Sequence, residues 1–170
     1  MKPSADPSKR ILLDQLPRLL AGYGKTFAQY GDNYAAAVIV VCDLDNRNRA
    51  AFEAELRSLA AALDPCPVHG FCLAIEEGEA WYLGDMNAIQ AAYPAAKKQV
   101  LSRYSNDSIC GTWELLADAI YQGGASALSA AGWRRVGLEK SVWAERITPH
   151  MDVDRNNSPS FQVFVETVRR

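Results

Sequence analysis

The run from Ala35 to Cys42 constrains the fold more than any other segment of the chain. Its eight consecutive residues are all apolar, and four of them are β-branched. A short, continuously apolar segment of this kind is typical of a strand that is covered on both faces, as in the centre of a parallel sheet. The sequence therefore predicts a buried parallel strand at this position.

A helix and a second strand are predicted directly after this run. Between Asn46 and Leu63 the apolar residues recur at helical spacing, and the prolines at 65 and 67 end the helix because proline cannot continue its hydrogen-bond ladder. The segment Val68 to Ile75 is again strand-like. Strand, helix and strand form a right-handed βαβ unit. We therefore expect an α/β fold with a small parallel sheet and flanking helices.

The chain on either side of this unit is predicted to be mainly helical. Lys9 to Tyr23 has apolar residues at helical spacing, and Pro17 within it indicates a kinked or two-part helix, followed by a turn at Gly31–Asn33. Beyond Glu79 three helices are indicated by Thr112 as an N-cap, by Leu138 to Thr148, and by Ser158 as an N-cap with Pro159 after it. We expect a single domain over residues 1–170, with a βαβ core at 35–85 and a mainly helical part at 86–170.

Two strands alone leave both edges of a parallel sheet open. Three explanations stay open at this point: strands are missed by the pattern, a partner chain supplies them, or an N-terminal βα unit is absent before Ala35.

Composition excludes several classes of protein. The 170 residues carry a net charge of -2, which excludes a dedicated basic nucleic-acid-binding protein. The sequence has no apolar run of about 20 residues and no signal peptide, so we expect a cytoplasmic protein without a membrane partner. The four cysteines form no CxxC pair and are interpreted as reduced thiols rather than a zinc site.

Acidic residues follow both predicted strands. The first strand runs into Asp43-Leu44-Asp45-Asn46, and the second into Glu76-Glu77-Gly78-Glu79. Ligands of open parallel sheets bind beyond the carboxyl ends of the strands. In extended geometry Asp43 and Asp45 point the same way, and two close carboxylates repel each other unless a cation relieves them. Since Mg²⁺ prefers oxygen ligands, the sequence predicts a Mg²⁺ (or Mn²⁺) site at this edge.

The acids also have plainer explanations. Asp45 or Asn46 would cap the following helix, and Glu76 and Glu77 would form a solvated turn. An aspartate pair after an apolar strand also begins haloacid-dehalogenase-type phosphatases, but the hydroxyl residue expected two positions after the second aspartate is Arg47 here. The chain has no phosphate-binding glycine motif and no nucleophile elbow.

Four segments together carry a family resemblance. They are the apolar strand with Asp43-x-Asp45, Glu76-x-x-Glu79-Ala80-Trp81-Tyr82-Leu83-Gly84-Asp85, Lys140-x-x-x-Ala144-x-x-Ile147, and Asn157-Ser158-Pro159-Ser160-Phe161-x-x-Phe164. This series resembles an uncharacterised bacterial TOPRIM-like family, related to the nuclease domain of OLD-family proteins, whose members are often encoded beside ATPases. The resemblance covers about Leu12 to Val168.

The resemblance implies a metal-dependent nuclease. Asp43 and Asp45 would hold the ion, Glu79 would be the next ligand by position, and Lys140 would contact phosphate or lie on the surface in the first turn of a helix. The family's glutamate-ending first strand has no counterpart before Ala35. Nucleic acid, an ATPase partner and a second copy of the chain are the implied partners, with a role in bacterial defence. The alternative is a non-catalytic interaction protein whose C-terminal helices bind a partner ATPase or a second copy.

Overall fold

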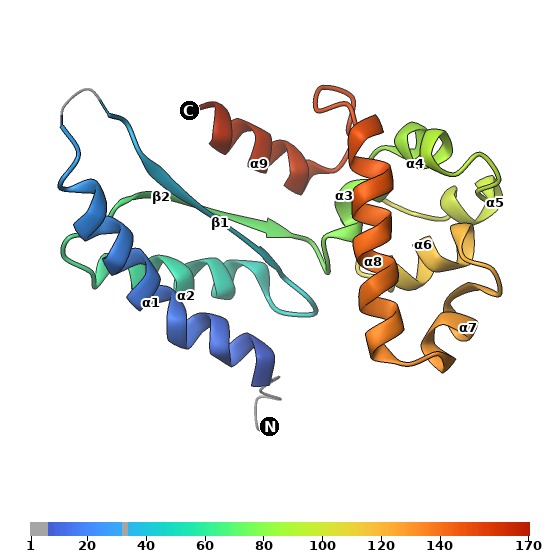
Figure 1. The fold of residues 1–170 in the computed structure, drawn as a ribbon, viewed down its shortest axis with the longest axis horizontal. Coiled ribbons are helices and arrows are strands. Elements are labelled where there is room, and N and C mark those ends of the chain that lie inside the picture. The colour runs from blue at the N-terminus through green and yellow to red at the C-terminus, as the bar shows by residue number, and fades with distance from the viewer. Residues whose placement is uncertain (1–6, 32–33) are drawn as a thin grey trace. The chain divides into compact units, whose positions relative to one another are not determined.

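The computed structural model describes residues 7–31 and 34–170, so the segment before Pro7 and residues 32–33 of the predicted Gly31–Asn33 turn lie outside the described residues (Figure 1). It is an α/β fold with a small two-stranded parallel sheet and many helices. The elements are α1 (Pro7–Phe27), β1 (Ala37–Asp43), α2 (Arg49–Ala61), β2 (Val68–Ala74), α3 (Glu79–Leu83), α4 (Met86–Ala92), α5 (Lys98–Leu101), α6 (Thr112–Ile120), α7 (Gly124–Ala130), α8 (Trp133–Ile147), the 3-10 turn η1 (Thr148–His150) and α9 (Pro159–Arg169).

The described residues group into two compact units. One contains the chain up to Val40 together with Arg47–Phe71, and the other contains Val41–Asn46 and Cys72–Arg170. The carboxyl ends of both strands and all of the predicted site residues therefore belong to the second unit. No helix in the described ranges combines the length and the apolar character that crossing a bilayer requires.

The first unit packs α1 against α2. Leu16 and Leu20 of α1 are buried, as are Phe52, Leu56 and Ala60 of α2, which confirms the apolar stripe expected on that helix. The helix predicted over Lys9 to Tyr23 lies within α1. Of the two expected forms, kinked or two-part, the two-part form is wrong because α1 runs as one helix through Pro17. A single proline removes one backbone donor, and the remaining turns of this long helix still form.

Helix α2 begins later than expected. Its N-cap is Asn48, whose side chain accepts a hydrogen bond from the backbone N–H of Ala51 at 3.0 Å. The prediction that Asp45 or Asn46 would cap this helix is therefore wrong, and Asp45 is left at the end of the sheet.

Strand β1 is less buried than its sequence predicts. None of its residues is buried, and Val41 is 47% exposed. The expectation of a strand covered on both faces is wrong for the described residues, because no residue of β1 is buried. In a parallel sheet such cover comes from helices that pack on both faces of the strands.

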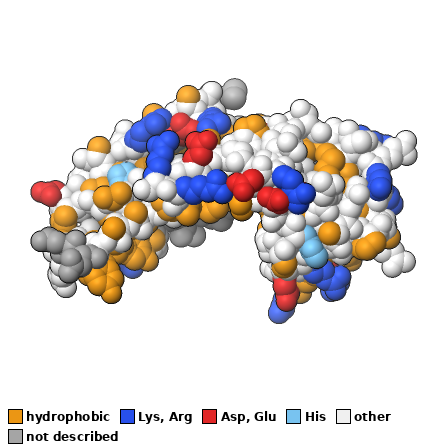
Figure 2. All heavy atoms as spheres, turned by 90° about the horizontal axis from the view of Figure 1, so that it is seen from above, with side chains coloured by type: hydrophobic (Ala, Val, Ile, Leu, Met, Phe, Trp, Pro, Cys, Tyr) orange, Lys and Arg blue, Asp and Glu red, His pale blue; other side chains and the backbone are white. Residues whose placement is uncertain are grey.

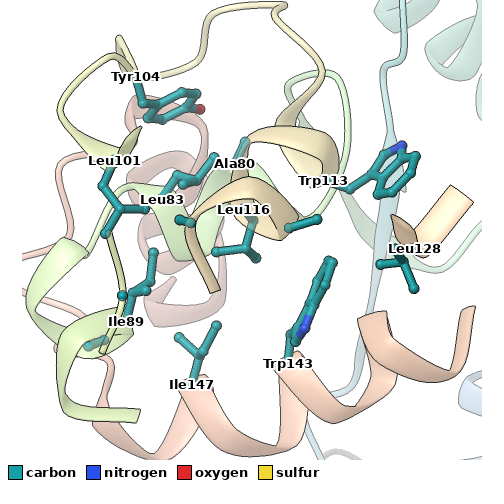
Figure 3. Close-up of a cluster of buried hydrophobic side chains, with 14 of the residues drawn as sticks. Ala80, Leu83, Ile89, Leu101, Tyr104, Trp113, Leu116, Leu128, Trp143 and Ile147 are labelled. Atoms are coloured by element: carbon teal, nitrogen blue, oxygen red, sulfur yellow. The ribbon is translucent and has the colours of Figure 1, made fainter. Parts of the chain in front are cut away.

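The second unit has a large apolar core of its own. Figure 3 shows Trp143 and Ile147 of α8 pointing toward Leu116 of α6, and each of the three is at most 1% exposed. Helix α8 begins at Trp133, five residues before the predicted start at Leu138, so Lys140 lies in the middle of the helix and not in its first turn.

The last helix forms as predicted. Ser158 is the N-cap of α9, its hydroxyl accepts a hydrogen bond from the N–H of Phe161 at 3.2 Å, and Pro159 takes the first helical position. Asp107, from a loop distant in the sequence, also stabilises the start of this helix. Its carboxylate accepts hydrogen bonds of 2.7 Å from the Ser158 hydroxyl and from the N–H of Ser160.

Candidate functional site at the acidic strand ends

The acidic ends of the two strands meet at one edge of the sheet. Beyond the strands proper, the N–H of Asp45 donates to the carbonyl of Glu76 at 2.8 Å, and the two residues form an isolated bridge. The chain then passes Gly78, where an added Cβ would lie 4.0 Å from Oδ1 of Asp43. The structure therefore brings together the two acidic clusters that the sequence predicts at a common edge.

Both residues of this bridge have a strained backbone. Asp45 has φ 53° and Glu76 has φ 64°, which is the left-handed region that favours glycine. The extended geometry that would point Asp43 and Asp45 the same way therefore does not hold at Asp45. Left-handed backbone at a residue with a Cβ costs about 1–2 kcal/mol, so surrounding contacts must hold these two residues in place.

The side chain of Glu76 provides such a contact. Its carboxylate accepts hydrogen bonds from the N–H groups of Cys110 at 3.2 Å, Gly111 at 2.9 Å and Thr112 at 2.9 Å, at the start of α6. A carboxylate is favourable there because the first N–H groups of a helix have no partner within the helix and carry partial positive charge. Glu76 thus joins the sheet edge to α6.

This contact corrects two expectations from the sequence. The N-cap of α6 is Gly111 and not Thr112, whose side chain is fully buried and whose hydroxyl oxygen makes no hydrogen bond in the structure. Glu76 is not a solvated turn residue, because it provides the cap from 36 residues away. N-cap preferences describe only residues next to the helix start in the sequence, so they do not predict a cap that Glu76 provides.

Glu77 and Glu79 share one cation. The ammonium of Lys140, from α8, donates to Oε2 of Glu77 at 2.8 Å and lies 3.1 Å from Oε2 of Glu79. The side chain of Glu79 is 5% exposed, whereas those of Glu77 and Lys140 are 25% and 29% exposed. This group of three charged side chains is therefore buried at Glu79 and reaches solvent at Glu77 and Lys140.

Burial and charge shift the pKa values of this group. Burial raises the pKa of Glu79, and the attraction of Lys140 opposes that shift. Burial alone would lower the pKa of Lys140, but Glu79 and Glu77 together raise it. Burial, with the charges of Glu77 and Glu76, also raises the pKa of Glu114. Lys140 is therefore a firmly charged cation among several carboxylates.

The acids at this edge offer carboxylate oxygens, which are the ligand type that Mg²⁺ takes from proteins. Asp43 is exposed, Asp45 is half-buried, and one or two carboxylates are what Mg²⁺ usually takes from a protein. Glu79 would have to exchange Lys140 for the ion. Among the residues that the structure describes, no group of three or more potential metal-binding side chains converges on one point.

Charges of both signs are mixed on one face of the molecule. On the face drawn in Figure 2, Lys and Arg side chains lie next to Asp and Glu side chains and do not form one continuous basic field. Non-specific binding to nucleic acid depends on such a basic field.

The comparison with known families places this chain. A family model described as a domain of unknown function (DUF4276) matches residues 6–169, nearly the full length. The chain belongs to the DUF4276 family. No curated protein and no solved structure matches it. The DUF4276 description assigns no activity, so the TOPRIM-like type and the nuclease function are proposals.

Proposed function

We propose that this DUF4276 protein is a TOPRIM-like phosphodiesterase that depends on Mg²⁺ or Mn²⁺ and cleaves nucleic acid. The proposal is supported above all by one observation: the acidic ends of two parallel strands share an edge, where Asp45 bridges to Glu76 and Asp43 lies beside Gly78. Parallel sheets bind ligands at this edge. The strained backbone at Asp45 and Glu76 supports it further, because such strain is found disproportionately at active sites.

Each residue has a role in this proposal. Asp43 and Asp45 hold the ion. Glu79 is not a ligand of the ion while its carboxylate contacts Lys140. Glu76 fixes the edge by its bonds to the start of α6. A bound Mg²⁺ supplies Lewis acidity toward a phosphate and a water molecule. Since the net charge of the chain is -2, nucleic acid would contact it chiefly through that ion.

The experiment compares wild type with Asp43→Asn in two assays. Isothermal titration with Mn²⁺ measures the dissociation constant, and a labelled oligodeoxynucleotide measures cleavage with and without the ion. We expect the exposed, isosteric change at Asp43 to lose both binding and cleavage while the fold persists. Glu145→Gln, an exposed change on α8, is the matched control and should behave like wild type. Equal absence of Mn²⁺ binding in wild type and Asp43→Asn would remove the basis of the proposal.

A second candidate is a non-catalytic interaction protein. The favouring observation is that Glu76, Glu77 and Glu79 each have a partner within the fold, which gives these acids a structural role without a metal. Trp133 at the start of α8 is 82% exposed, and tryptophan is enriched among the anchor residues of interfaces, so it would contact a partner ATPase or a second copy.

Light scattering after size exclusion separates this candidate from the first. A dimer that binds no Mn²⁺ and becomes monomeric as Trp133→Ser would favour the interaction protein. A monomer that binds Mn²⁺ would contradict it.

A further inference from the structure

Four aromatic side chains form a continuous row at the end of α1, all within the first unit. The ring centroids of Tyr23 and Phe27 lie 5.7 Å apart, and those of Phe27 and Tyr30 lie 5.5 Å apart. The row ends at Tyr34, whose ring centroid is 5.6 Å from that of Tyr30. These four side chains are called the aromatic row below.

The backbone carries the row beyond the end of the helix. Helix α1 ends at Phe27, and the N–H of Tyr30 donates to the carbonyl of Phe27 at 3.0 Å. The N–H of Tyr34 donates to the carbonyl of Gly31 at 2.9 Å. Backbone hydrogen bonds therefore hold the last two rings of the row next to those of the helix.

The aromatic row is open to solvent. Its three tyrosines, at positions 23, 30 and 34, are 48%, 46% and 75% exposed, and Phe27 is half-buried. Single exposed aromatic residues are ordinary at a protein surface, whereas contiguous exposed apolar surface marks interaction sites. Because each ring contacts the next, the row is one contiguous surface and not four separate residues.

The charge of α1 favours an anionic ligand for this surface. The helix contains four basic residues and one acidic residue, a net charge of +3, whereas the whole chain carries -2. Lys25 is exposed and lies between Tyr23 and Phe27 in the sequence. The acid nearest to the row in the sequence, Asp32, lies outside the described residues. A basic helix attracts a polyanion, so the ligand should combine negative charge with flat apolar groups.

Single-stranded nucleic acid combines these two properties. Its backbone is a chain of phosphates, and its bases present flat aromatic faces. Proteins that bind single strands without sequence preference use basic residues for the backbone and a series of aromatic side chains on which successive bases stack. In a duplex the bases stack on one another, so their faces are not open to protein rings.

We propose that the aromatic row binds single-stranded nucleic acid, with bases stacked on its tyrosine rings and a phosphate contacted by Lys25. This inference rests on the proposed function for its ligand, nucleic acid, and narrows that ligand to a strand whose bases are exposed. It adds a contact that does not depend on the divalent ion.

The test is fluorescence anisotropy of a labelled thymidine oligodeoxynucleotide of about ten nucleotides, measured with the full chain in EDTA so that no divalent ion contributes. The double variant Tyr30→Leu, Tyr34→Leu removes two exposed rings and keeps apolar side chains. We expect its dissociation constant to be at least about tenfold higher than that of wild type, because two stacking contacts are lost. The double variant Tyr30→Phe, Tyr34→Phe keeps both rings and should bind like wild type.

Two controls test the position and the strand preference. Trp133→Leu removes an exposed aromatic residue of the second unit and should leave the dissociation constant unchanged. A duplex of the same length should bind at least about tenfold more weakly than the single strand. Equal binding of duplex and single strand by wild type would overturn base stacking.

Lys25→Gln covers the case in which the leucine variant does not fold, because it leaves all four rings in place. It should bind the single strand more weakly than wild type does. The slope of log K against log salt concentration should become shallower by about 0.7, the value for one phosphate contact on a single strand. An unchanged slope would overturn the proposed phosphate contact.

The outcomes separate this inference from the proposed function. The inference is overturned if wild type does not bind the oligonucleotide in EDTA, or if the leucine variant binds it like wild type. It is also overturned by a wild-type dimer that the leucine variant converts to a monomer, because the row would then contact a second copy. If binding in EDTA depends on the row but wild type has no affinity for Mn²⁺, the proposed function fails and the aromatic row stands.

Discussion

The contact between Glu76 and the start of α6 can be tested by a stability measurement. Its carboxylate accepts hydrogen bonds from three successive backbone N–H groups, at 2.9 to 3.2 Å. A hydrogen bond to a charged group contributes about 1.5–3 kcal/mol. These three share one partly exposed acceptor, so their sum is smaller than three separate bonds. We expect Glu76→Ala to lower the free energy of unfolding by about 2–4 kcal/mol.

Two further variants separate charge from shape. Glu76→Gln keeps an oxygen acceptor but loses the charge, so it should lose about 1–2 kcal/mol. Glu145→Gln removes an exposed glutamate of α8 and should stay within about 0.5 kcal/mol of wild type.

The assay is urea unfolding followed by circular dichroism, together with hydrogen exchange. Exchange of the amides of Gly111 and Thr112 should accelerate in Glu76→Ala before exchange elsewhere in the second unit does. Unfolding free energies of Glu76→Ala and Glu145→Gln that agree within about 0.5 kcal/mol would refute the assigned role of Glu76.

Three other predictions follow from the described contacts. Because the pKa of Glu79 is raised above its ordinary 4.5, the folded protein binds the proton of this carboxyl group more tightly than the unfolded chain does. The unfolding free energy of wild type relative to Glu79→Gln should therefore fall as pH rises from 4.5. Urea unfolding at several pH values measures this difference, and a difference that increases with pH would contradict the prediction. Asp107→Ala should lower the unfolding free energy by about 2 kcal/mol and expose α9 to limited proteolysis, whereas unchanged proteolysis would count against its anchoring role. Gly84→Ala should lower the melting temperature of the second unit, because the added Cβ would collide with Oδ1 of Asn156. An unchanged melting temperature would show that the loop around Asn156 moves without a cost in stability.

The elements with local signals could be predicted from the sequence. The N-cap and proline of α9, the apolar stripe of α2 and the position of β2 are all encoded within a few residues. The shared edge could also be predicted, because parallel strands present their carboxyl ends on the same side.

The partners of the acids could not be predicted in this way. Glu76 contacts amides 34 to 36 residues later, and Glu79 contacts Lys140, so neither contact leaves a local pattern in the sequence. The start of α8 at Trp133 could not be predicted either, because an exposed tryptophan followed by two arginines does not mark an apolar face.

The low burial of β1 shows where sequence and described structure disagree. The apolar run from Ala35 to Cys42 predicts a strand that is covered on both faces in the centre of a parallel sheet, while β2 is the one strand neighbour of β1 among the described residues. The sequence pattern indicates a strand that is buried on both faces, whereas no residue of β1 is buried in the described structure.

The central claim is that the two acidic strand ends form one site for a divalent ion. Paramagnetic broadening of backbone amide signals by substoichiometric Mn²⁺ tests it most directly, because the effect depends steeply on distance from the ion. We predict that the amides of Asp43, Asp45 and Gly78 broaden first and together in wild type, and do not broaden in Asp43→Asn. Broadening at only one strand end, or at neither, would contradict the claim.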